Sequence, residues 1–136
     1  MMSRNGFPVS KLHGELRPEE RDIAMREFRE GSSRVLITTN VFVSGVPAVT
    51  VVVNYDLPTE RLGDTGQVLG DCATYLRRIT RCGIFGRKGM AVNFIQSKQD
   101  EDVMLSIEQH CSPSQRMTTN WNPKDIEGLA LEFARR

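Results

Sequence analysis

The alternation of short runs typical of β-strands with amphipathic helical stretches constrains the fold of this chain more than any other feature. We expect strands at Val9–Leu12, Val35–Thr38, Val49–Val53 and Met90–Ile95. The second run is apolar without a two-residue alternation, which is typical of a strand covered by helices on both sheet faces. This order predicts βαβ units around a parallel sheet, and therefore an α/β fold.

Helices are expected between and after these strands. Pro18 opens the first at its favoured position, Gly31 ends it, and its apolar face contains Ile23, Met25 and Phe28. Two more are expected at Asp100–His110 and Lys124–Ala134, and the apolar spacing of the second predicts that it docks on the domain. The segment Pro58–Ala73 has a loop-like composition, and loops of this length are usually functional or mobile.

Length, charge and cysteines restrict the class of protein. The 136 residues suffice for one buried core, so we expect a single domain over residues 1–136. A net charge of +1 excludes a generally basic nucleic-acid coat, so any contact with nucleic acid must come from local patches.

The chain has three cysteines, Cys72, Cys82 and Cys111, an odd number without C-x-x-C spacing. This disfavours a disulfide framework and structural zinc, and it favours a reduced, intracellular compartment. No leader pattern and no apolar run of about 18 residues is present, so neither secretion nor a membrane span is expected.

Residues 75–89 carry the strongest local charge, with Arg77, Arg78, Arg81, Arg87 and Lys88 and no acidic residue. Arginines three positions apart on a helical turn share one face, and a guanidinium matches phosphate oxygens bidentately. Arg78 and Arg81 are therefore candidates to grip one phosphate ligand. A solvated helix start would give the same pattern without any ligand.

Residues 75–89 also resemble the arginine motif that closes the second RecA-like lobe of DEAD-box RNA helicases, His-Arg-Ile-Gly-Arg-Thr-Gly-Arg followed by Phe-Gly. Further matches follow the order and spacing of that lobe: L-H-G-E-L at 12–16, F-R-E-G at 28–31, V-L-I-T-T-N-V at 35–41 and V-V-V-N-Y-D-L-P at 51–58. The last match, the glycine-rich insertion before Tyr75, and A-V-N-F-I-Q-S-K at 91–98 are most similar to the mRNA-export branch that works at the nuclear pore. The resemblance covers nearly the whole chain and implies a RecA-like parallel sheet flanked by helices.

The resemblance implies that this lobe binds the backbone of single-stranded RNA and completes the ATP site of a partner lobe. Gly14 permits close backbone approach and Arg21 lies in the first turns of a helix, so both become RNA-contact candidates. Thr39 and Gly45 are two further candidates, although ordinary turn chemistry after a strand explains them equally well from local sequence. His13 is assigned no chemistry, and no residue is assigned to a metal.

The nucleotide-binding and catalytic candidates are Arg78 and Arg81, with Arg81 as an arginine finger. Ile84 replaces a second arginine expected at the γ-phosphate, and an arginine finger contributes about 10³ to 10⁵ in rate. Ser44 and Pro47 replace the family's Arg and Asp, and proline lacks the acceptor oxygens that a carboxylate offers to a ribose. We therefore expect impaired ATP hydrolysis.

The sequence lacks a G-x-x-x-x-G-K-[ST] loop and an Asp-Glu-Ala-Asp run. ATP with Mg²⁺ is therefore expected only in a complete two-lobe assembly, and not with this chain alone. Expected partners are single-stranded RNA, an N-terminal P-loop lobe and a regulatory protein of mRNA export, in the cytoplasm or nucleus and at the nuclear pore. The match begins after the family lobe's first strand and helix, so we expect the sheet to lack one strand and to expose an edge that favours self-association.

Three functions remain open. The chain is the C-terminal lobe of an ATP-dependent RNA helicase, or a stand-alone degenerate module that binds RNA or a regulatory protein without catalysis. The departures at Ser44, Pro47 and Ile84 favour the second hypothesis. A third is an α/β adaptor with no RNA role, whose arginines bind an acidic protein.

Overall fold

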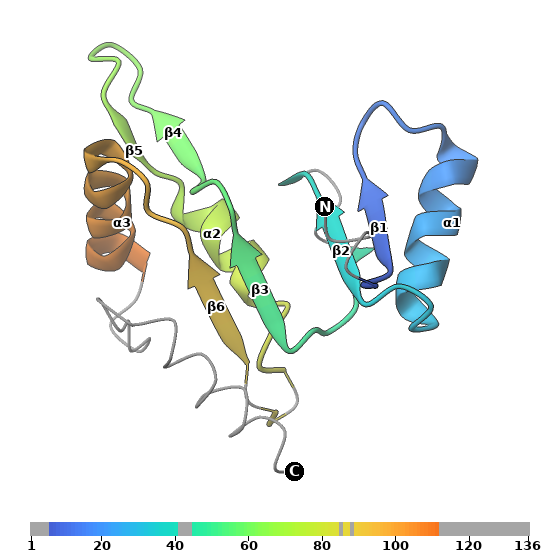
Figure 1. Ribbon diagram of the computed structural model, residues 1–136. Helices are drawn as coiled ribbons and strands as arrows, with labels where there is room; N and C mark the ends of the chain where they lie inside the picture. The colour runs from blue at the N-terminus through green and yellow to red at the C-terminus, as the bar shows by residue number, and fades with distance from the viewer. Residues whose placement is uncertain (1–5, 41–44, 85, 88, 112–136) are drawn as a thin grey trace.

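Two pairs of parallel strands form the framework of the fold (Figure 1). The structure is a computed structural model, and it describes residues 6–111 except 41–44, 85 and 88. Strand β1 (Val9–Leu12) pairs with β2 (Val35–Thr38), and β3 (Val51–Asn54) pairs with β6 (Met90–Asn93). The expected α/β class with parallel strands is therefore confirmed. The expected helix Lys124–Ala134 lies outside the described residues.

The two parallel pairs are not hydrogen-bonded to each other within the described residues. Strand β2 pairs with β1 alone and β3 with β6 alone, and Figure 1 shows the two pairs lying apart. Ile37 of β2 is 52% exposed, and Val51 and Val53 of β3 are 42% and 53% exposed. Within the described residues the sheet is thus interrupted between β2 and β3, and each of these two strands has one edge without a paired neighbour.

Helix α1 (Pro18–Arg29) packs against β1. The Glu20 carboxylate accepts the Arg17 backbone N–H at 2.9 Å, which satisfies a free donor at the helix start and lowers the pKa of Glu20. The predicted apolar face is wrong at Ile23, which is 44% exposed, while Ala24 is buried. Side chains separated by one position point in different directions on a helix, so Ala24 is buried while its neighbour Ile23 is exposed.

The segment predicted as a loop, Pro58–Ala73, instead contains a β-hairpin and the start of a helix. Strand β4 (Thr59–Arg61) pairs antiparallel with β5 (Val68–Gly70). The turn is closed by hydrogen bonds from Leu62 N–H to the Gln67 carbonyl and from Gly66 N–H to the Leu62 carbonyl. Gly66 has φ +66°, a conformation that glycine adopts without strain. Strands this short carry too few alternating positions for a pattern to reveal them.

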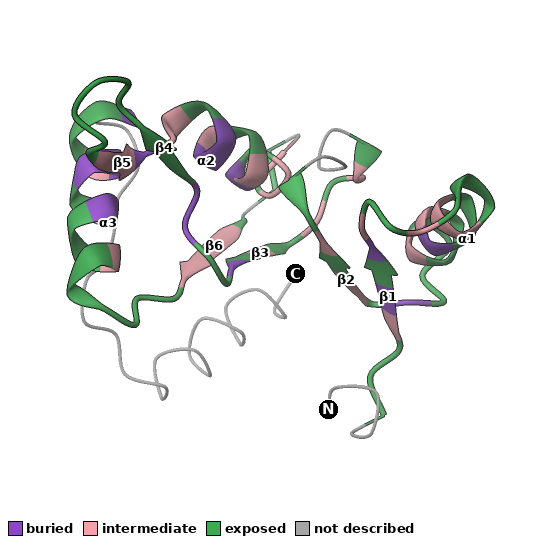
Figure 2. Cartoon of the chain, turned by 90° about the horizontal axis from the view of Figure 1, so that it is seen from above, coloured by how far each residue is buried: buried purple, intermediate pink, exposed green. Residues whose placement is uncertain are grey.

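The main hydrophobic cluster lies between α2 (Cys72–Ile79) and α3 (Lys98–Cys111). Its buried members are Leu57, Tyr75, Ile79, Val103, Ile107 and Cys111. Figure 2 shows the buried segments gathered on α2, α3 and the segment after β3, with shorter buried stretches on β1 and α1. None of the described helices is both long and apolar enough to cross a bilayer.

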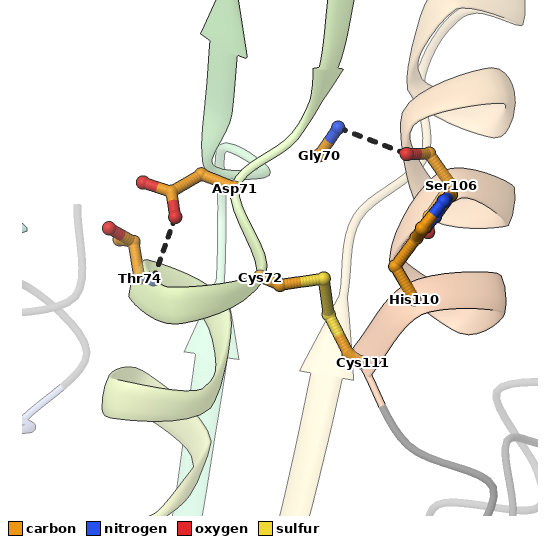
Figure 3. The surroundings of a disulfide bond; sticks show 7 residues. All are labelled: Gly70, Asp71, Cys72, Thr74, Ser106, His110 and Cys111. Carbon is orange, nitrogen blue, oxygen red and sulfur yellow. Dashed lines mark hydrogen bonds between the residues drawn. A yellow bond between two sulfur atoms is a disulfide. The ribbon is translucent and has the colours of Figure 1, made fainter.

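Helix α3 is joined to the start of α2 by a disulfide, which the sequence analysis did not predict (Figure 3). Cys72 and Cys111 are 39 positions apart in sequence, and their Cα atoms lie 5.4 Å apart. The expectation that the cysteines form no disulfide is therefore wrong, because packing of α3 against β5 and α2 brings together two residues with no local spacing signal. Cys82 is a free thiol whose pKa is raised by burial.

The same contact requires a glycine in β5. A Cβ atom added at Gly70 would lie 3.0 Å from both the Ile107 Cδ1 and the Val103 carbonyl oxygen, and closer still to the Ile107 Cγ1. The Gly70 N–H donates to the Ser106 hydroxyl at 3.4 Å, and the Asp71 carboxylate accepts the Thr74 N–H at 2.9 Å, which caps α2 (Figure 3). The hairpin, α2 and α3 therefore form one packed unit.

Candidate nucleic-acid interface

The RNA-contact candidates Gly14 and Thr39 lie at the carboxyl edge of the β1–β2 pair. The register pairs Leu12 with Thr38, so the residues after the two strands leave the sheet at the same edge. The Thr39 N–H donates to the Leu12 carbonyl at 3.2 Å. Ligands of open α/β sheets bind outside the carboxyl ends of the strands. A Cβ atom at Gly14 would meet nothing within 4 Å, so a ligand has open space there.

Arg21 reaches this edge from α1. Its Nη2 donates to the Gly14 carbonyl at 2.6 Å, which joins the second turn of the helix to the loop after β1. Two candidates that are seven positions apart in sequence are thus in direct contact. This edge therefore brings together the Arg21 guanidinium, the exposed Gly14 backbone and Thr39.

Gly45 is placed beside α1 by a different contact. The Arg29 Nη2 donates to the Gly45 carbonyl at 3.2 Å, and a Cβ atom at Gly45 would lie 3.6 Å from the Met25 Cε. Ser44, the position where the family's arginine is replaced, lies outside the described residues. Pro47 is half-buried.

Arg78 is half-buried, and neutral oxygens occupy most of its guanidinium. Its Nε and Nη2 both donate to the Asn40 Oδ1, and its Nη1 donates to the Asn54 Oδ1 at 3.0 Å and to the Asp56 carbonyl at 2.7 Å. Burial is the main cause that lowers the pKa of Arg78. Sequence reasoning did not single out Asn40 or Asn54 as partners of this arginine.

Asn54 belongs to a chain of partly buried hydrogen bonds across the carboxyl ends of β3 and β6. Its Nδ2 donates to the Asn93 Oδ1 at 2.8 Å, and the Asn93 Nδ2 donates to the Tyr75 hydroxyl at 3.1 Å. Tyr75 precedes Arg78 by one turn of α2. The hydrogen bonds therefore run from Arg78 through Asn54 and Asn93 to Tyr75, and the backbone of α2 closes the ring. Burial raises the pKa of Tyr75. The available sequence signal was that each asparagine follows a run of apolar residues and immediately precedes an aromatic residue.

Arg81 lies in the turn that follows α2. The helix ends at Ile79, and the Arg81 N–H donates to the Arg78 carbonyl in the turn that follows. The Val49 N–H donates to the Arg81 carbonyl at 2.8 Å, beside a parallel bridge between Val49 and Cys82. The Arg81 Nε is buried and has no hydrogen-bond partner among the described residues. The joint grip of Arg78 and Arg81 on one phosphate ligand therefore stays a prediction, with Arg81 in the turn after α2 and not in the helix itself.

The remaining cations of the arginine segment are differently placed. Arg77 is exposed and its Nη2 donates to the Thr74 hydroxyl at 3.2 Å, while Arg87 is exposed and Lys88 lies outside the described residues. Within the described ranges, no group of three or more His, Cys, Asp or Glu side chains is arranged to hold a metal ion.

Comparison with known proteins gives a consistent result. The family model for the helicase conserved C-terminal domain matches residues 1–86. The ATP-dependent RNA helicase DBP5 of Saccharomyces cerevisiae is 46% identical over 111 residues, which cover 80% of this chain and 22% of that protein. The chain thus spans about a fifth of the length of this curated relative.

Two solved structures of Dbp5 from S. cerevisiae resemble this fold. The structure bound to RNA and ADP BeF3 has a TM-score of 0.79 and 38% identity, covering 98% of this chain and 34% of that one. A variant bound to Nup159, Gle1, IP6 and ADP has a TM-score of 0.75 and 37% identity, covering 99% of this chain and 34% of that one. These matches confirm the RecA-like helicase lobe that the sequence resemblance implied.

Proposed function

This chain belongs to the helicase conserved C-terminal domain family, as a lobe of the Dbp5 type of DEAD-box RNA helicase, and we propose that it binds the backbone of single-stranded RNA at the carboxyl edge of β1 and β2. The observation that carries the proposal is the contact of Arg21 with Gly14 at the edge where Thr39 leaves β2. A positive side chain, an open glycine backbone and a hydroxyl supply the groups that phosphate and sugar contacts use.

The RNA-bound Dbp5 structure supports this proposal, because it pairs a similar lobe with RNA and a nucleotide. In the assembly that we propose, an N-terminal P-loop lobe holds ATP and Mg²⁺, and this chain alone does not hydrolyse ATP. ATP bound in that assembly supplies the phosphoryl group, and Arg81 is the side chain of this lobe that we assign to it.

We assign Arg81 because it keeps the position of an arginine finger in the family motif that residues 75–89 resemble. Thr39 and Gly45 are kept as RNA-contact candidates. Ile84 has no charge to offer, so we propose that hydrolysis by the assembly is slow. The guanidinium of Arg78 is largely occupied, and we do not assign it to the nucleotide.

The RNA proposal is tested with this chain and a fluorescein-labelled oligouridylate at increasing salt. The logarithm of the association constant should fall with the logarithm of the salt concentration, because neutralised phosphates release counterions. Arg21→Gln should weaken binding and reduce the slope by about 0.7, the value for one phosphate of a single strand. Arg26→Gln is the matched control, since Arg26 lies on the same helix and is exposed. Salt-independent binding, or equal losses in the two variants, would contradict the proposal.

The second test addresses ATP hydrolysis by the two-lobe assembly. The chain is mixed with a P-loop lobe, and RNA-dependent ATP hydrolysis is measured with and without Ile84→Arg. We expect low turnover in the unmodified mixture and a gain of at least about tenfold with Ile84→Arg, a conservative share of an arginine finger's contribution. If the unmodified mixture turns over ATP at the rate given by Ile84→Arg, the proposed impairment is refuted.

A second candidate function is regulated binding without catalysis. Two observations favour it: Ile84 replaces a phosphate-binding arginine, and a similar Dbp5 lobe has been solved with Nup159 and Gle1. We propose that a regulatory protein of mRNA export at the nuclear pore is the partner in that case. Pull-down with Gle1 tests this binding, and RNA-dependent ATP hydrolysis in a mixture with a P-loop lobe distinguishes the two functions, because a stand-alone module binds without turnover.

A further inference from the structure

We propose that Arg78 is a positioning residue, which holds the backbone after β2 at a fixed place relative to α2. The inference rests on the proposed function, since the backbone after β2 contains the RNA-contact candidates Thr39 and Gly45. It assigns Arg78 a role different from that of Arg81, although both belong to the same segment.

The first argument is the use of the donors. A guanidinium has five N–H groups, and four of those of Arg78 are directed at oxygens of this chain. Two go to the Asn40 side chain after β2, and two go to Asn54 and Asp56 at the end of β3. A bidentate grip on a phosphate needs two parallel N–H groups, and the remaining one cannot supply them.

The second argument is the rigidity of one side of this contact. Asn54 is 2% exposed and is held by Asn93, which in turn is held by the Tyr75 hydroxyl on the helix that carries Arg78. The ring fixes Arg78 against β3 and β6. Asn40 is exposed and lies on the other strand pair, so the guanidinium joins a fixed element to a more accessible one.

The third argument is the break in the sheet. No backbone ladder joins β2 to β3 in the described residues, so the two strand pairs need other contacts to fix their relative position. The described hydrogen bonds between residues 6–40 and 45–111 include those of Arg78 to Asn40 and that of Arg29 to the Gly45 carbonyl. Both reach the segment that contains the RNA-contact candidates after β2.

A lysine cannot replace Arg78 in this contact, because its ammonium is a point donor and cannot reach Asn40 and Asn54 at the same time. Arg78→Lys therefore keeps the charge and removes the bridge. Asn40→Leu removes the bridge from the other end and leaves the arginine in place. Asn40 is exposed, so this second variant is expected to fold even if the first does not.

The test measures binding of fluorescein-labelled oligouridylate by the full chain against salt. Arg78→Lys and Asn40→Leu should each weaken binding about tenfold, which is within the range of coupling between contacting side chains, with an unchanged salt slope. The double variant should bind no more weakly than the weaker single variant, because both remove one contact. Arg77→Lys, on the exposed neighbour, is the matched control and should bind as wild type.

Two results would overturn the proposal. One is wild-type binding by Arg78→Lys. The other is a salt slope reduced by about 0.7 in Arg78→Ala together with no effect of Asn40→Leu, which would make Arg78 a direct phosphate ligand.

A measurement without RNA separates this proposal from the proposed function. The Arg78 Nε–H signal in ¹H–¹⁵N spectra should exchange slowly with water in the wild type and rapidly in Asn40→Leu. Rapid exchange in the wild type overturns the positioning role. Slow exchange without any RNA binding refutes the proposed function and leaves the bridge itself supported.

Discussion

Gly70→Ala tests the packing of α3 against the hairpin. The added Cβ atom would lie 3.0 Å from the Val103 carbonyl oxygen and closer than that to the Ile107 Cγ1. Neither neighbour can yield easily, because one is helix backbone and Ile107 is 0% exposed in the main hydrophobic cluster. Overpacking of this kind costs about 1–3 kcal/mol. At roughly 4 °C per kcal/mol for a chain of this size, the melting temperature should fall by about 4–12 °C.

Gly63→Ala is the matched control for this change. Gly63 lies in the turn of the same hairpin, and a Cβ atom there would meet nothing within 4 Å. Its φ is not in the left-handed region, so alanine should leave stability unchanged or raise it by up to about 1 kcal/mol through the unfolded chain.

A double-mutant cycle locates the cause. Ile107→Ala alone should cost about 2–5 kcal/mol, because it empties a fully buried site. Gly70→Ala in that background should cost less than it does alone, because the methyl group enters the vacated space. Melting by circular dichroism measures all four proteins. Equal melting of wild type and Gly70→Ala, or strictly additive losses, would refute the described contact between β5 and α3.

Three further predictions concern the same unit. Asp71→Ala should cost about 1 kcal/mol at pH 7 by removing the cap of α2; the capping hydrogen bonds lower the Asp71 pKa below its ordinary value of 3.8, so in melts across pH the difference from wild type should persist above pH 4 and shrink as pH falls through the folded pKa. Reduction of the Cys72–Cys111 disulfide should lower the unfolding free energy by at most about 4 kcal/mol, from the loop of 39 positions that it closes, and denaturant titration with Cys82→Ser as control would detect this. Tyr75→Phe should cost about 1 kcal/mol, since it leaves a half-buried Asn93 N–H without its acceptor; an unchanged denaturation midpoint would contradict the hydrogen bonds that join Tyr75, Asn93 and Asn54.

The strands and the first helix were predictable because their signals are local. Val9–Leu12 and Val35–Thr38 occur where the runs typical of β-strands placed them, and α1 begins at Pro18. The strand predicted at Val49–Val53 is observed at Val51–Asn54, and the one predicted at Met90–Ile95 ends at Asn93. The helix predicted at Asp100–His110 extends over Lys98–Cys111. Errors of this size are expected where hydrogen bonds, not composition, decide the ends.

The candidate site was less predictable, because its contacts join distant parts of the chain. Asn40 and Asn54 are short amide side chains that sequence patterns assign to turns, and nothing in the spacing pairs them with Arg78. The choice of Gly14, Arg21, Thr39 and Gly45 came from a family resemblance, while their mutual placement came from the fold. The disulfide was missed for the same reason as the hydrogen bonds of Arg78 to Asn40 and Asn54. Its cysteines are 39 positions apart, and no local sequence pattern pairs residues at that separation.

The uneven distribution of buried side chains determines which part of the chain opens locally at the lowest free energy. The main cluster lies entirely within residues 57–111, whereas Leu12 and Ala24 are the buried apolar side chains described in residues 6–40. Segments with few buried apolar contacts open at free energies well below that of global unfolding. Amide protons of β1 and β2 should therefore exchange through local openings that leave α2 and α3 intact, so the β1–β2 part of the lobe can open and close while the main cluster stays folded.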